Sequence, residues 1–348
     1  MTAYPEVGAA LATWLAGKLG VDAVSVDDLE RHAEGFSWHT YTFTASWTDP
    51  DSGTPVRRGF AVRREPEDGL LAPYDIRKEY AVHRAVVEHS DVPMPGLHWL
   101  ELDPEPLGMP FYVMDRVEGV VPVPWRRDDP RVFPDEAARH ALGVDFVEVL
   151  ARIAAIDWKA AGLGEVLDAR DDPEEAARAE IEAWARFYHD SVLVEEPILR
   201  EAIAWLRANL AVSGHLALVH ADYRLGNFMV RDGRIVAVFD WELAHIGDPV
   251  FDVAWAGMPL YRGRDPRLSQ LLEPAEFFAL YTDLTGIPVE PEVYKFWTVF
   301  GHLRAGAPYL RATKAFEDGR SDDVRLAAFG HRLLFVLKSL ARELGLRS

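Results

Sequence analysis

The 348-residue chain contains no cysteine. Disulfide bridges, a thiol nucleophile and cysteine-ligated zinc are therefore excluded. No apolar run approaches the roughly 18 residues that a membrane-spanning helix needs, so we expect no membrane partner. The residues after Met1 lack a basic region followed by an apolar stretch, so we expect no secretory signal. A cytoplasmic location is therefore predicted.

Basic residues are too few to balance the acidic ones. The chain has 37 Lys and Arg against 56 Asp and Glu, a formal net charge of −19. This argues against nucleic acid as a partner, because phosphate backbones bind basic surfaces. The acidic balance fits either a cationic ligand or the ordinary solubility of an enzyme. With 49% hydrophobic residues, the chain can bury a large core, and its length indicates about two domains.

The first third of the chain has mostly strand-like composition. A helical pattern opens the chain and ends near Gly20, and a second helix is predicted at 74–88. The β-rich runs 38–47 and 59–62 are joined by Pro, Asp and Gly, which indicates a hairpin. A buried strand is expected at 110–114.

The rest of the chain is mainly helical. Apolar residues at three- and four-residue spacing predict helices at 137–156, 172–189, 197–210, 268–286, 290–305 and 322–344. A small β island interrupts them, with strands at 228–230 and 235–239 joined by an Asp-Gly turn. The sequence thus predicts an α+β protein in two parts, 1–117 and 118–348, without internal repeats.

Two polar clusters at this β island carry the most information about function. Asp222 and Asn227 precede the hairpin and Asp240 follows it, so we expect all three near one end of a small sheet. Mg²⁺ prefers carboxylate and amide oxygens together with phosphate oxygens and water, which makes Asn227 and Asp240 candidate ligands. Asp222 can accept the proton of an attacking hydroxyl. Phosphoryl transfer needs mostly positioning and charge neutralisation, and this set supplies both.

The competing interpretation is that Asp222 and Asn227 are ordinary turn residues. Against it, the chain has only two asparagines, Asn209 and Asn227, and one of them falls at this position. His220 is interpreted as bracing the loop and not as a base. A Walker phosphate loop, a His-Glu-x-x-His zinc helix and a Gly-x-Ser-x-Gly elbow are absent, so those chemistries lack support.

The ordered set His220-Ala221-Asp222, Asn227 and Asp240 resembles the catalytic pattern of the aminoglycoside phosphotransferase and choline kinase family, which usually has glycine in place of Ala221. The stretches Ala-Asp-Tyr-Arg-Leu-Gly-Asn and Phe-Asp-Trp-Glu-Leu-Ala are similar to a branch found beside or fused to acyl-CoA dehydrogenases. The resemblance covers roughly 30 to 340. It implies a protein-kinase-like bilobal fold, with a small β-rich nucleotide-binding N-lobe and a larger, mainly helical C-lobe for catalysis and substrate binding.

The same resemblance implies roles for the residues of the clusters. Asp222 is the general base, and Asn227 and Asp240 bind Mg²⁺. Arg224 stands where protein kinases have a lysine near the transferred phosphate, and a guanidinium can meet phosphate oxygens bidentately. A solvated loop cation is the alternative for Arg224. Glu242 either joins the metal shell, directly or through water, or caps the following turn.

In the N-lobe, the resemblance implies a cation that contacts the nucleotide phosphates and pairs with Glu79 on a helix. Arg63 occupies the position of the usual lysine. Arg64 is the competing choice, because strand alternation puts only one of the two in the cleft. An ordinary surface ion pair is the alternative for Arg63 and Glu79.

Other nucleotide contacts are implied less specifically. Ser37 and backbone amides of the loop 34–39 can donate to phosphate, although this loop holds a single glycine where kinases have three. Asp115, Arg116 and Val117 resemble the connector whose backbone holds the adenine edge. Asp248 and Asp252 are expected to hydrogen-bond loops from below.

The resemblance predicts an ATP- and Mg²⁺-dependent kinase, GTP not being excluded, that phosphorylates a hydroxyl of a small molecule. Aminoglycoside-type antibiotics fit the family name and the acidic surface, whereas hydroxyacyl-CoA or another hydroxylated metabolite fits the closer branch and is favoured. A catalytically weak or inactive nucleotide-binding protein is the alternative function. The oligomeric state is left open. Five aromatic residues either line an acceptor pocket or belong to the core: Trp241, Trp255, Tyr261, Phe296 and Trp297.

Overall fold

The chain is described from a computed structural model, which covers residues 4–32, 38–66, 71, 73–123, 126, 129–320 and 322–346. It divides into two compact units: Met1–Arg84 with Pro95–Glu118, and Ala85–Met94 with Gly119–Ser348. The first is β-rich and the second mainly helical, which confirms the predicted α+β class. Within the described ranges, no helix is both long and apolar enough to cross a membrane.

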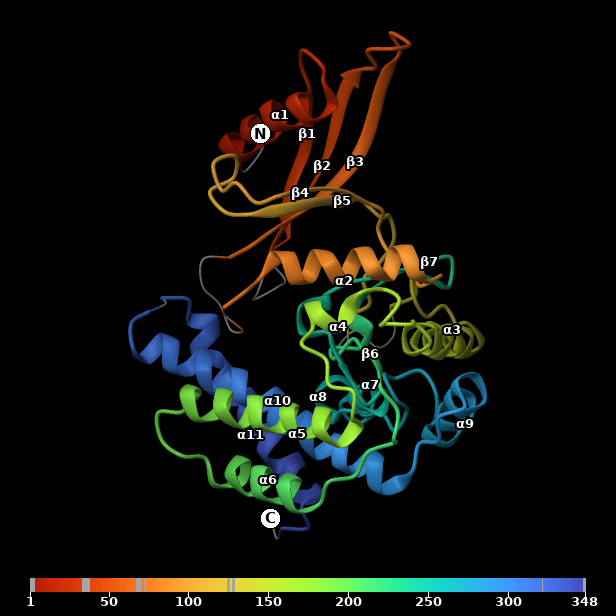
Figure 1. Ribbon diagram of the computed structural model, residues 1–348, viewed down its shortest axis with the longest axis vertical. Helices are drawn as coiled ribbons and strands as arrows, with labels where there is room; N and C mark the ends of the chain where they lie inside the picture. The colour runs from red at the N-terminus through yellow and green to blue at the C-terminus, as the bar shows by residue number, and fades with distance from the viewer. Residues whose placement is uncertain are drawn as a thin grey trace. The chain divides into compact units, whose positions relative to one another are not determined.

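The first unit is built on one antiparallel sheet with the strand order β1-β2-β3-β5-β4 (Figure 1). Its strands are β1 (Ser25–His32), β2 (His39–Thr48), β3 (Pro55–Arg64), β4 (Leu97–Glu101) and β5 (Phe111–Asp115). Helix α1 (Pro5–Leu19) precedes β1, and α2 (Ile76–His89) begins in this unit and ends in the second. β2 and β3 pair along their whole length as the predicted hairpin.

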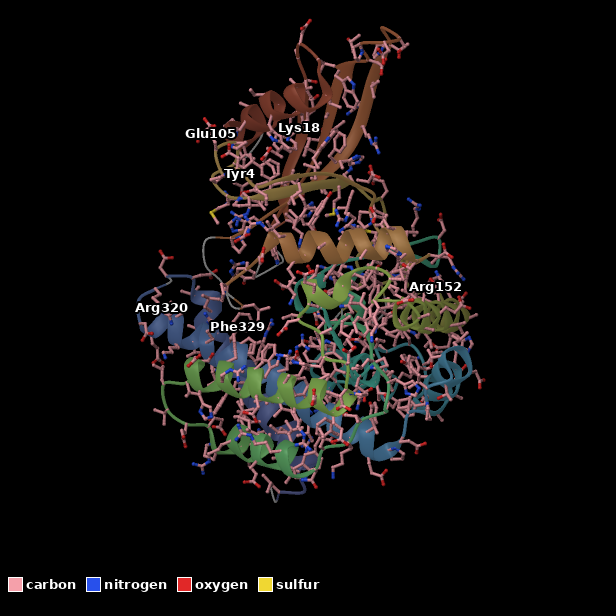
Figure 2. The ribbon with its side chains drawn as sticks, viewed as in Figure 1. Tyr4, Lys18, Glu105, Arg152, Arg320 and Phe329 are labelled. Atoms are coloured by element: carbon pink, nitrogen blue, oxygen red, sulfur yellow. The ribbon has the colours of Figure 1, made fainter. Side chains whose placement is uncertain are left out.

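Aromatic side chains hold α1 on this sheet. The Trp14 ring lies edge-on to Phe111 and Trp99, with ring centres 4.8 Å and 5.8 Å apart. Its indole N–H donates to Glu101 (2.9 Å), and the same carboxylate pairs with Lys18 (3.0 Å; Lys18 is labelled in Figure 2). Burial of large rings against the sheet stabilises this packing.

Strand β1 was not predicted, and its sequence explains why. In Ser25–His32 only Leu29 is buried, so the alternation that marks a half-buried strand is missing. The pairing with β2 also shifts register between Asp27 and Glu30, where Asp28 has a φ of 54°. An irregular edge strand of this kind depends on its neighbour for its backbone partners.

The second unit contains most of the helices and three short sheet segments. Its helices are α3 (Glu136–Ala154), α4 (Leu163–Val166), α5 (Pro173–Ser191), α6 (Pro197–Ala208), α7 (Val250–Ala256), α8 (Pro259–Arg262), α9 (Pro274–Thr285), α10 (Pro291–Glu317) and α11 (Val324–Glu343). Its strands are β6 (Ala217–Val219), β7 (Phe228–Arg231), β8 (Arg234–Val238) and β9 (His245–Gly247), with 3₁₀ turns η1 (Leu225–Asn227) and η2 (Trp241–Leu243). The six helices expected here are confirmed, with different ends.

Helix α10 forms the centre of the helical part and packs on α5, α6, α7 and α11 (Figure 1). It was predicted to end near residue 305 but continues to Glu317, with Pro308 inside it. A proline in a helix removes the hydrogen bond to the carbonyl four residues earlier, here that of Arg304. Packing on several sides outweighs this loss, so the helix persists.

The β7–β8 hairpin is closed by the predicted Asp-Gly turn. Asp232 and Gly233 both have positive φ (52° and 74°), the conformation of a type I′ turn. Helix α3 supports the hairpin and the segment before it. Asp145 accepts from the Ile235 N–H (2.7 Å), and the Tyr223 hydroxyl donates to a carbonyl of α3 (2.6 Å). The hairpin is therefore held from behind by a buried helix.

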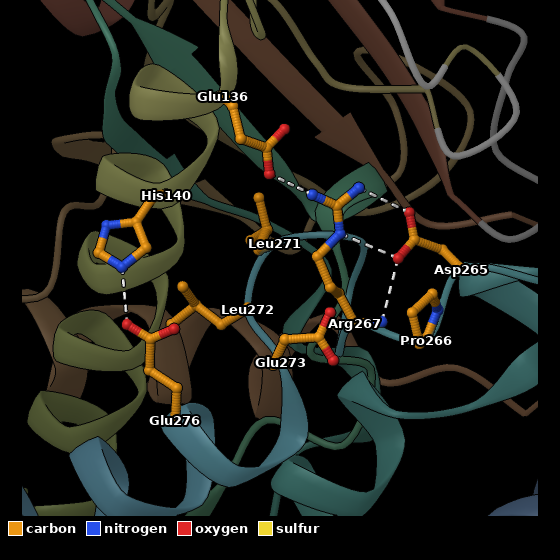
Figure 3. A pocket seen from close by; sticks show the side chains of 9 residues that line it. All are labelled: Glu136, His140, Asp265, Pro266, Arg267, Leu271, Leu272, Glu273 and Glu276. Carbon is orange, nitrogen blue, oxygen red and sulfur yellow. Dashed lines mark hydrogen bonds and ion pairs between the residues drawn. The ribbon is translucent and has the colours of Figure 1, made fainter.

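The loop between α8 and α9 is fastened to α3 by ion pairs. Arg267 binds both Asp265 and Glu136, and His140 lies 2.6 Å from Glu276 (Figure 3). These side chains line a hollow of about 360 Å³. Its charged groups are largely paired with one another across the hollow, so we assign it to fastening this loop.

Candidate active site

The hairpin brings the three predicted polar residues together. Asp222 follows β6, Asn227 ends η1, and Asp240 follows β8. Phe228 pairs with Val238, and the next N–H, of Phe239, donates to the Asn227 carbonyl (2.9 Å). Asn227 and Asp240 therefore stand at the same end of the hairpin, as the sequence predicts.

His220 connects the segment that carries Asp222 to the segment that carries Asp240. Its Nε2 donates to the Phe239 carbonyl (2.8 Å), and its Nδ1 accepts from the Asp222 N–H (3.2 Å). Complete burial lowers the pKa of His220, so the ring is neutral and can accept at Nδ1. The prediction that His220 braces the loop is confirmed.

Two aspartates support the loops from below, also as predicted. Asp252 accepts from the backbone N–H groups of His220 (2.7 Å) and Ala221 (2.8 Å). Burial raises the pKa of Asp252 to about 7 although both N–H groups favour its charged form. Asp248 accepts from the N–H and the hydroxyl of Ser213 (2.5 Å and 2.8 Å).

Two residues of the site have left-handed backbone conformations. Ala221, just before Asp222, has a φ of 70°, and Asp240 has a φ of 62°. For residues other than glycine this costs about 1–2 kcal/mol each. The cost explains why a glycine is expected at the position of Ala221. Strain of this kind persists where the surrounding structure fixes the position of a functional side chain.

The Asp222 carboxylate is oriented by three side-chain donors. Its Oδ1 accepts from Trp255 Nε1 (2.8 Å) and from Arg224 Nε (3.0 Å). Its Oδ2 accepts from Asn227 Nδ2 (2.6 Å). Burial opposes the charged form of Arg224, but Asp222, Tyr261 and Asp240 together outweigh it and raise the pKa of Arg224. Arg224 is therefore an ion-paired, half-buried residue and not a solvated loop cation.

The geometry leaves hard oxygen atoms for a metal ion. Because the Asn227 amide nitrogen faces Asp222, its Oδ1 is the atom available to a metal. Although burial lowers the pKa of His220, Asp222 and Asp240 both act to raise it, and they also raise the pKa of Arg224, because a nearby negative charge favours the charged form of each. The chemistry of this donor set fits Mg²⁺, which takes one or two carboxylates and completes its shell with phosphate and water.

Glu242 lies on η2, two residues after Asp240, and is half-buried. The described parts of the chain contain no group of three His, Asp or Glu side chains that could hold a metal alone. A site that uses an amide and shares its ion with a nucleotide does not need such a group.

Trp255 is a site residue whose role the sequence did not indicate. It lies on α7, whose residues are all buried, and its indole N–H reaches Asp222. Of the other aromatic candidates for an acceptor pocket, Trp241, Phe296 and Trp297 are core residues exposed by 2% or less. Tyr261 packs on the Trp255 ring, with centres 5.4 Å apart.

We expect Trp255→Phe to lower kcat about 10- to 100-fold, because a hydrogen bond to a charged group contributes about 1.5–3 kcal/mol. The ring is kept, so the KM for the nucleotide and the melting temperature should change little. Steady-state kinetics with Trp205→Phe on α6 as the control tests this. An unchanged kcat would show that the indole N–H does not help to position Asp222 for turnover.

In the first unit, the ion pair expected of Arg63 and Glu79 is present. Arg63 Nε lies 2.5 Å from Glu79 Oε1, and both side chains are buried. The Tyr112 hydroxyl donates to the same carboxylate oxygen (3.3 Å). Arg64 is engaged elsewhere, with the Leu107 carbonyl (2.7 Å) and His39 Nδ1 (2.6 Å). Arg63 is therefore the partner of Glu79, and the pair is not an ordinary surface pair.

The other nucleotide candidates of this unit are only partly described. Ser37 lies outside the described residues. The N–H groups of Asp115 and Arg116 donate to Gly96 (2.8 Å) and Gly59 (3.2 Å). Val117 has no backbone acceptor for its N–H within the described ranges. A backbone contact to a nucleotide base is thus open to Val117 and not to the two preceding N–H groups.

A match to a protein-family model identifies the family of this chain. The model of the phosphotransferase enzyme family matches residues 28–292, most of the chain. The chain belongs to this family. The sequence-based assignment to aminoglycoside phosphotransferase-like proteins is therefore confirmed.

The curated relatives of this chain are larger proteins. Mouse (Mus musculus) acyl-CoA dehydrogenase family member 10 is 27% identical over an alignment of 312 residues, and the match covers 86% of this chain. The match spans 27% of the mouse protein, so the chain corresponds to about a quarter of that relative. This confirms the similarity to the branch associated with acyl-CoA dehydrogenases.

Solved structures support the phosphotransferase fold. A candidate aminoglycoside phosphotransferase from Ralstonia eutropha is 24% identical, with a TM-score of 0.74 over 96% of this chain and 97% of that one. A thermostable mutant of an aminoglycoside phosphotransferase, in a ternary complex with AMP-PNP and hygromycin B, is 22% identical, with a TM-score of 0.57 over 95% and 98%. Identities this low establish the kinase-like fold alone.

Proposed function

We propose that this phosphotransferase is an ATP- and Mg²⁺-dependent kinase of a small molecule, with Asp222 as general base. The observation that carries the proposal is the Asp222 carboxylate, held by Trp255, Arg224 and Asn227. An ordinary turn residue would not need three side-chain donors. A general base does need them, because its carboxylate must be held in one orientation toward the acceptor hydroxyl.

In the proposed reaction, the acceptor hydroxyl attacks the γ-phosphorus of ATP and gives its proton to Asp222. The new bond joins the acceptor oxygen to phosphorus, the bond to the β–γ bridging oxygen breaks, and ADP leaves. Asn227 and Asp240 would bind Mg²⁺, and Glu242 either joins them, directly or through water, or caps the following turn. When bound, the ion neutralises charge on the phosphate oxygens.

Arg224 is proposed to serve two purposes in this step. It fixes Asp222 Oδ1 through Nε, and its remaining N–H groups can bind oxygens of the transferred phosphoryl group. A positive charge there counters the negative charge that develops on these oxygens. GTP as an alternative nucleotide is left open, because ATP recognition would rest on backbone groups such as Val117.

We propose that Arg63 contacts the nucleotide phosphates and that Glu79 orients it. Arg63→Met is expected to raise the KM for ATP about tenfold, because it removes one charge-assisted contact. Arg64→Met, one residue away on the other face of β3, is the matched control and should leave this KM unchanged. Equal effects of the two variants in ATP titrations would contradict the role of Arg63.

Removing Arg63 alone leaves Glu79 buried without its ion-pair partner, which destabilises proteins by about 3–5 kcal/mol. The double variant Arg63→Met with Glu79→Gln avoids that charge. It should recover the melting temperature without recovering the KM for ATP. This separates a role in stability from a role in nucleotide binding.

The function as a whole is tested by titration calorimetry with Mg·ATP and by ATP consumption over a panel of alcohols. The panel includes aminoglycosides, hydroxy acids and hydroxyacyl-CoA thioesters. Binding together with acceptor-dependent ADP formation supports the kinase. Binding of Mg·ATP with no ATP consumption in the presence of every acceptor tested would favour the alternative, a nucleotide-binding protein without catalysis.

A further inference from the structure

Helix α10 places a buried arginine against two segments of the proposed active site. Arg304 is 2% exposed, and its Nη2 donates to the Leu243 carbonyl (3.3 Å). Its guanidinium carbon lies 5.9 Å from the centre of the Trp255 ring. Leu243 ends η2, which follows Asp240, and Trp255 donates to Asp222. One side chain therefore contacts the neighbours of both carboxylates.

The burial of this guanidinium is costly. Its Nε and Nη1 have no hydrogen-bond partner within the described residues. Burial lowers the pKa of Arg304, while the carboxylates of Glu180, Asp222 and Asp252 favour its charged form. The side chain is enclosed by three aromatic rings, those of Trp184 (5.1 Å), Phe251 (5.1 Å) and Trp255 (5.9 Å). A buried charge that breaks the usual packing rules in this way is expected at functional sites.

On one side, Arg304 helps to fix Asp240. The carbonyl of Phe239, just before Asp240, accepts from His220 Nε2 (2.8 Å). The carbonyl of Leu243, at the end of the same segment, accepts from Arg304. Asp240 has a φ of 62°, a strained conformation that persists only where the surrounding structure fixes it. The segment with the proposed metal ligand is thus held before and after that residue.

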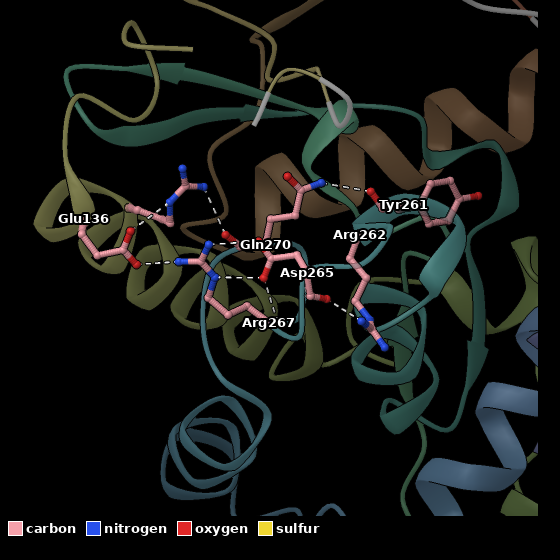
Figure 4. A network of polar contacts seen from close by, with 7 residues as sticks. Glu136, Tyr261, Arg262, Asp265, Arg267 and Gln270 are labelled. Atoms are coloured by element: carbon pink, nitrogen blue, oxygen red, sulfur yellow. Dashed lines mark hydrogen bonds and ion pairs between the residues drawn. The ribbon is translucent and has the colours of Figure 1, made fainter. Parts of the chain in front are cut away.

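On the other side, Arg304 helps to fix the ring of Trp255. The Tyr261 ring also packs on this indole, with ring centres 5.4 Å apart. Gln270 donates to the Tyr261 carbonyl (3.0 Å), in the network that fastens the loop after α8 (Figure 4). A cation over an aromatic ring is attracted more strongly when both are removed from water. The orientation of the indole N–H therefore depends on the guanidinium as well as on Tyr261.

From these contacts we propose that Arg304 is a positioning residue, which keeps the general base and the proposed metal ligand in their relative arrangement. The inference rests on the proposed kinase function. Arg304 acts on Asp222 through the indole of Trp255 and on Asp240 through the end of η2, without touching substrate or ion. Loss of an outer-shell partner of this kind typically lowers activity or metal affinity about 10- to 100-fold.

The first measurement needs no turnover. The indole N–H resonance of Trp255 is assigned by its loss in Trp255→Phe, and its exchange with solvent hydrogen is followed by NMR on the full chain. Arg304→Met is expected to speed this exchange about tenfold, because the indole is held less firmly against Asp222. The indole N–H of Trp205, on α6, should exchange as in the wild type. Unchanged exchange at Trp255 would overturn the proposal.

The second measurement is kinetic. Arg304→Met is expected to lower kcat about tenfold and to raise the Mg²⁺ concentration for half-maximal rate about threefold, with less than a twofold change in the KM for ATP. When it is combined with Trp255→Phe, kcat should fall little below that of Trp255→Phe alone, because Arg304 acts on the base through that ring. Fully additive losses in kcat would contradict the assignment.

Arg311→Met is the matched control, because Arg311 lies on the same helix but over Phe187 (5.0 Å). It should leave the indole exchange, kcat and the Mg²⁺ dependence unchanged. Equal effects of the two variants would show that only the packing of α10 matters, and would overturn the role of Arg304. An arginine that only stabilised the fold would change the melting temperature and none of these quantities when they are measured well below it.

If Arg304→Met fails to fold, Arg304→Lys decides with the same two measurements. It keeps the buried charge but lacks the planar guanidinium, so the effects on exchange and kcat should be about threefold. Unchanged values in that variant count against the proposal.

The two measurements also separate this inference from the kinase function. Wild-type protein that forms no ADP with any acceptor would overturn the kinase function, while the indole exchange would still decide whether Arg304 fixes Trp255. Faster exchange with an unchanged kcat, in a protein whose wild type is active, would overturn the positioning role and leave the kinase function intact.

Discussion

Replacing Asp222 with alanine is expected to lower turnover about 10³-fold, because a positioned general base contributes about 10²–10⁴ to the rate. Binding of Mg·ATP should weaken by less than about threefold, since Asp222 is not a proposed metal ligand. Single-turnover kinetics combined with calorimetry measures both quantities on the same protein. Turnover within a few-fold of the wild type would remove Asp222 from its role.

The more conservative variant, Asp222→Asn, is informative for a different reason. Asp222 Oδ2 now accepts from Asn227 Nδ2, and an amide nitrogen in that place would face another donor. The Asn227 amide is expected to rotate and turn its nitrogen toward the metal site. Asp222→Asn should therefore weaken Mg²⁺ binding as well as turnover, whereas Asp222→Ala should affect turnover alone.

Asp240→Asn is the second variant with a large expected effect. Removing one of two carboxylates near the ion should raise the Mg²⁺ concentration for half-maximal rate about 10- to 100-fold. The rate at low Mg²⁺ falls by the same factor. Titration of ADP formation against Mg²⁺ at fixed ATP measures this shift. A Mg²⁺ dependence equal to that of the wild type would exclude Asp240 as a ligand.

Glu242→Gln, measured in the same titration, decides between the two roles left open for Glu242. If the carboxylate binds the ion directly or through water, the Mg²⁺ curve shifts in the same direction as for Asp240→Asn, by a smaller factor. If it caps the turn at η2, the curve stays in place and only the melting temperature falls.

Much of the site could be predicted because it is local in sequence. A single hairpin with an Asp-Gly turn separates Asn227 from Asp240, so turn chemistry alone brings the two side chains together. The role of His220 was also foreseen, because it lies two residues before Asp222, whereas the expectation for Asp252, 32 residues from His220, came from the family resemblance. Sequence patterns are enough where residues close together in the chain fix the arrangement of the site.

The rest depends on tertiary packing, for which the sequence gives no local signal. Helix α7 is buried on all sides, so it has no apolar stripe and was not predicted. Its Trp255 reaches Asp222 across 33 residues. Strand β1 lacks alternation because only Leu29 faces the core.

The most direct test of the central claim is a crystal structure with Mg²⁺ and AMP-PNP. We predict an ion within bonding distance of Asn227 Oδ1 and a carboxylate oxygen of Asp240, with phosphate oxygens completing its shell. Asp222 should keep its contacts with Trp255 and Arg224 and should not coordinate the ion. An ion bound elsewhere, or coordinated by Asp222 without Asp240, would contradict the proposed assignment of base and metal ligands.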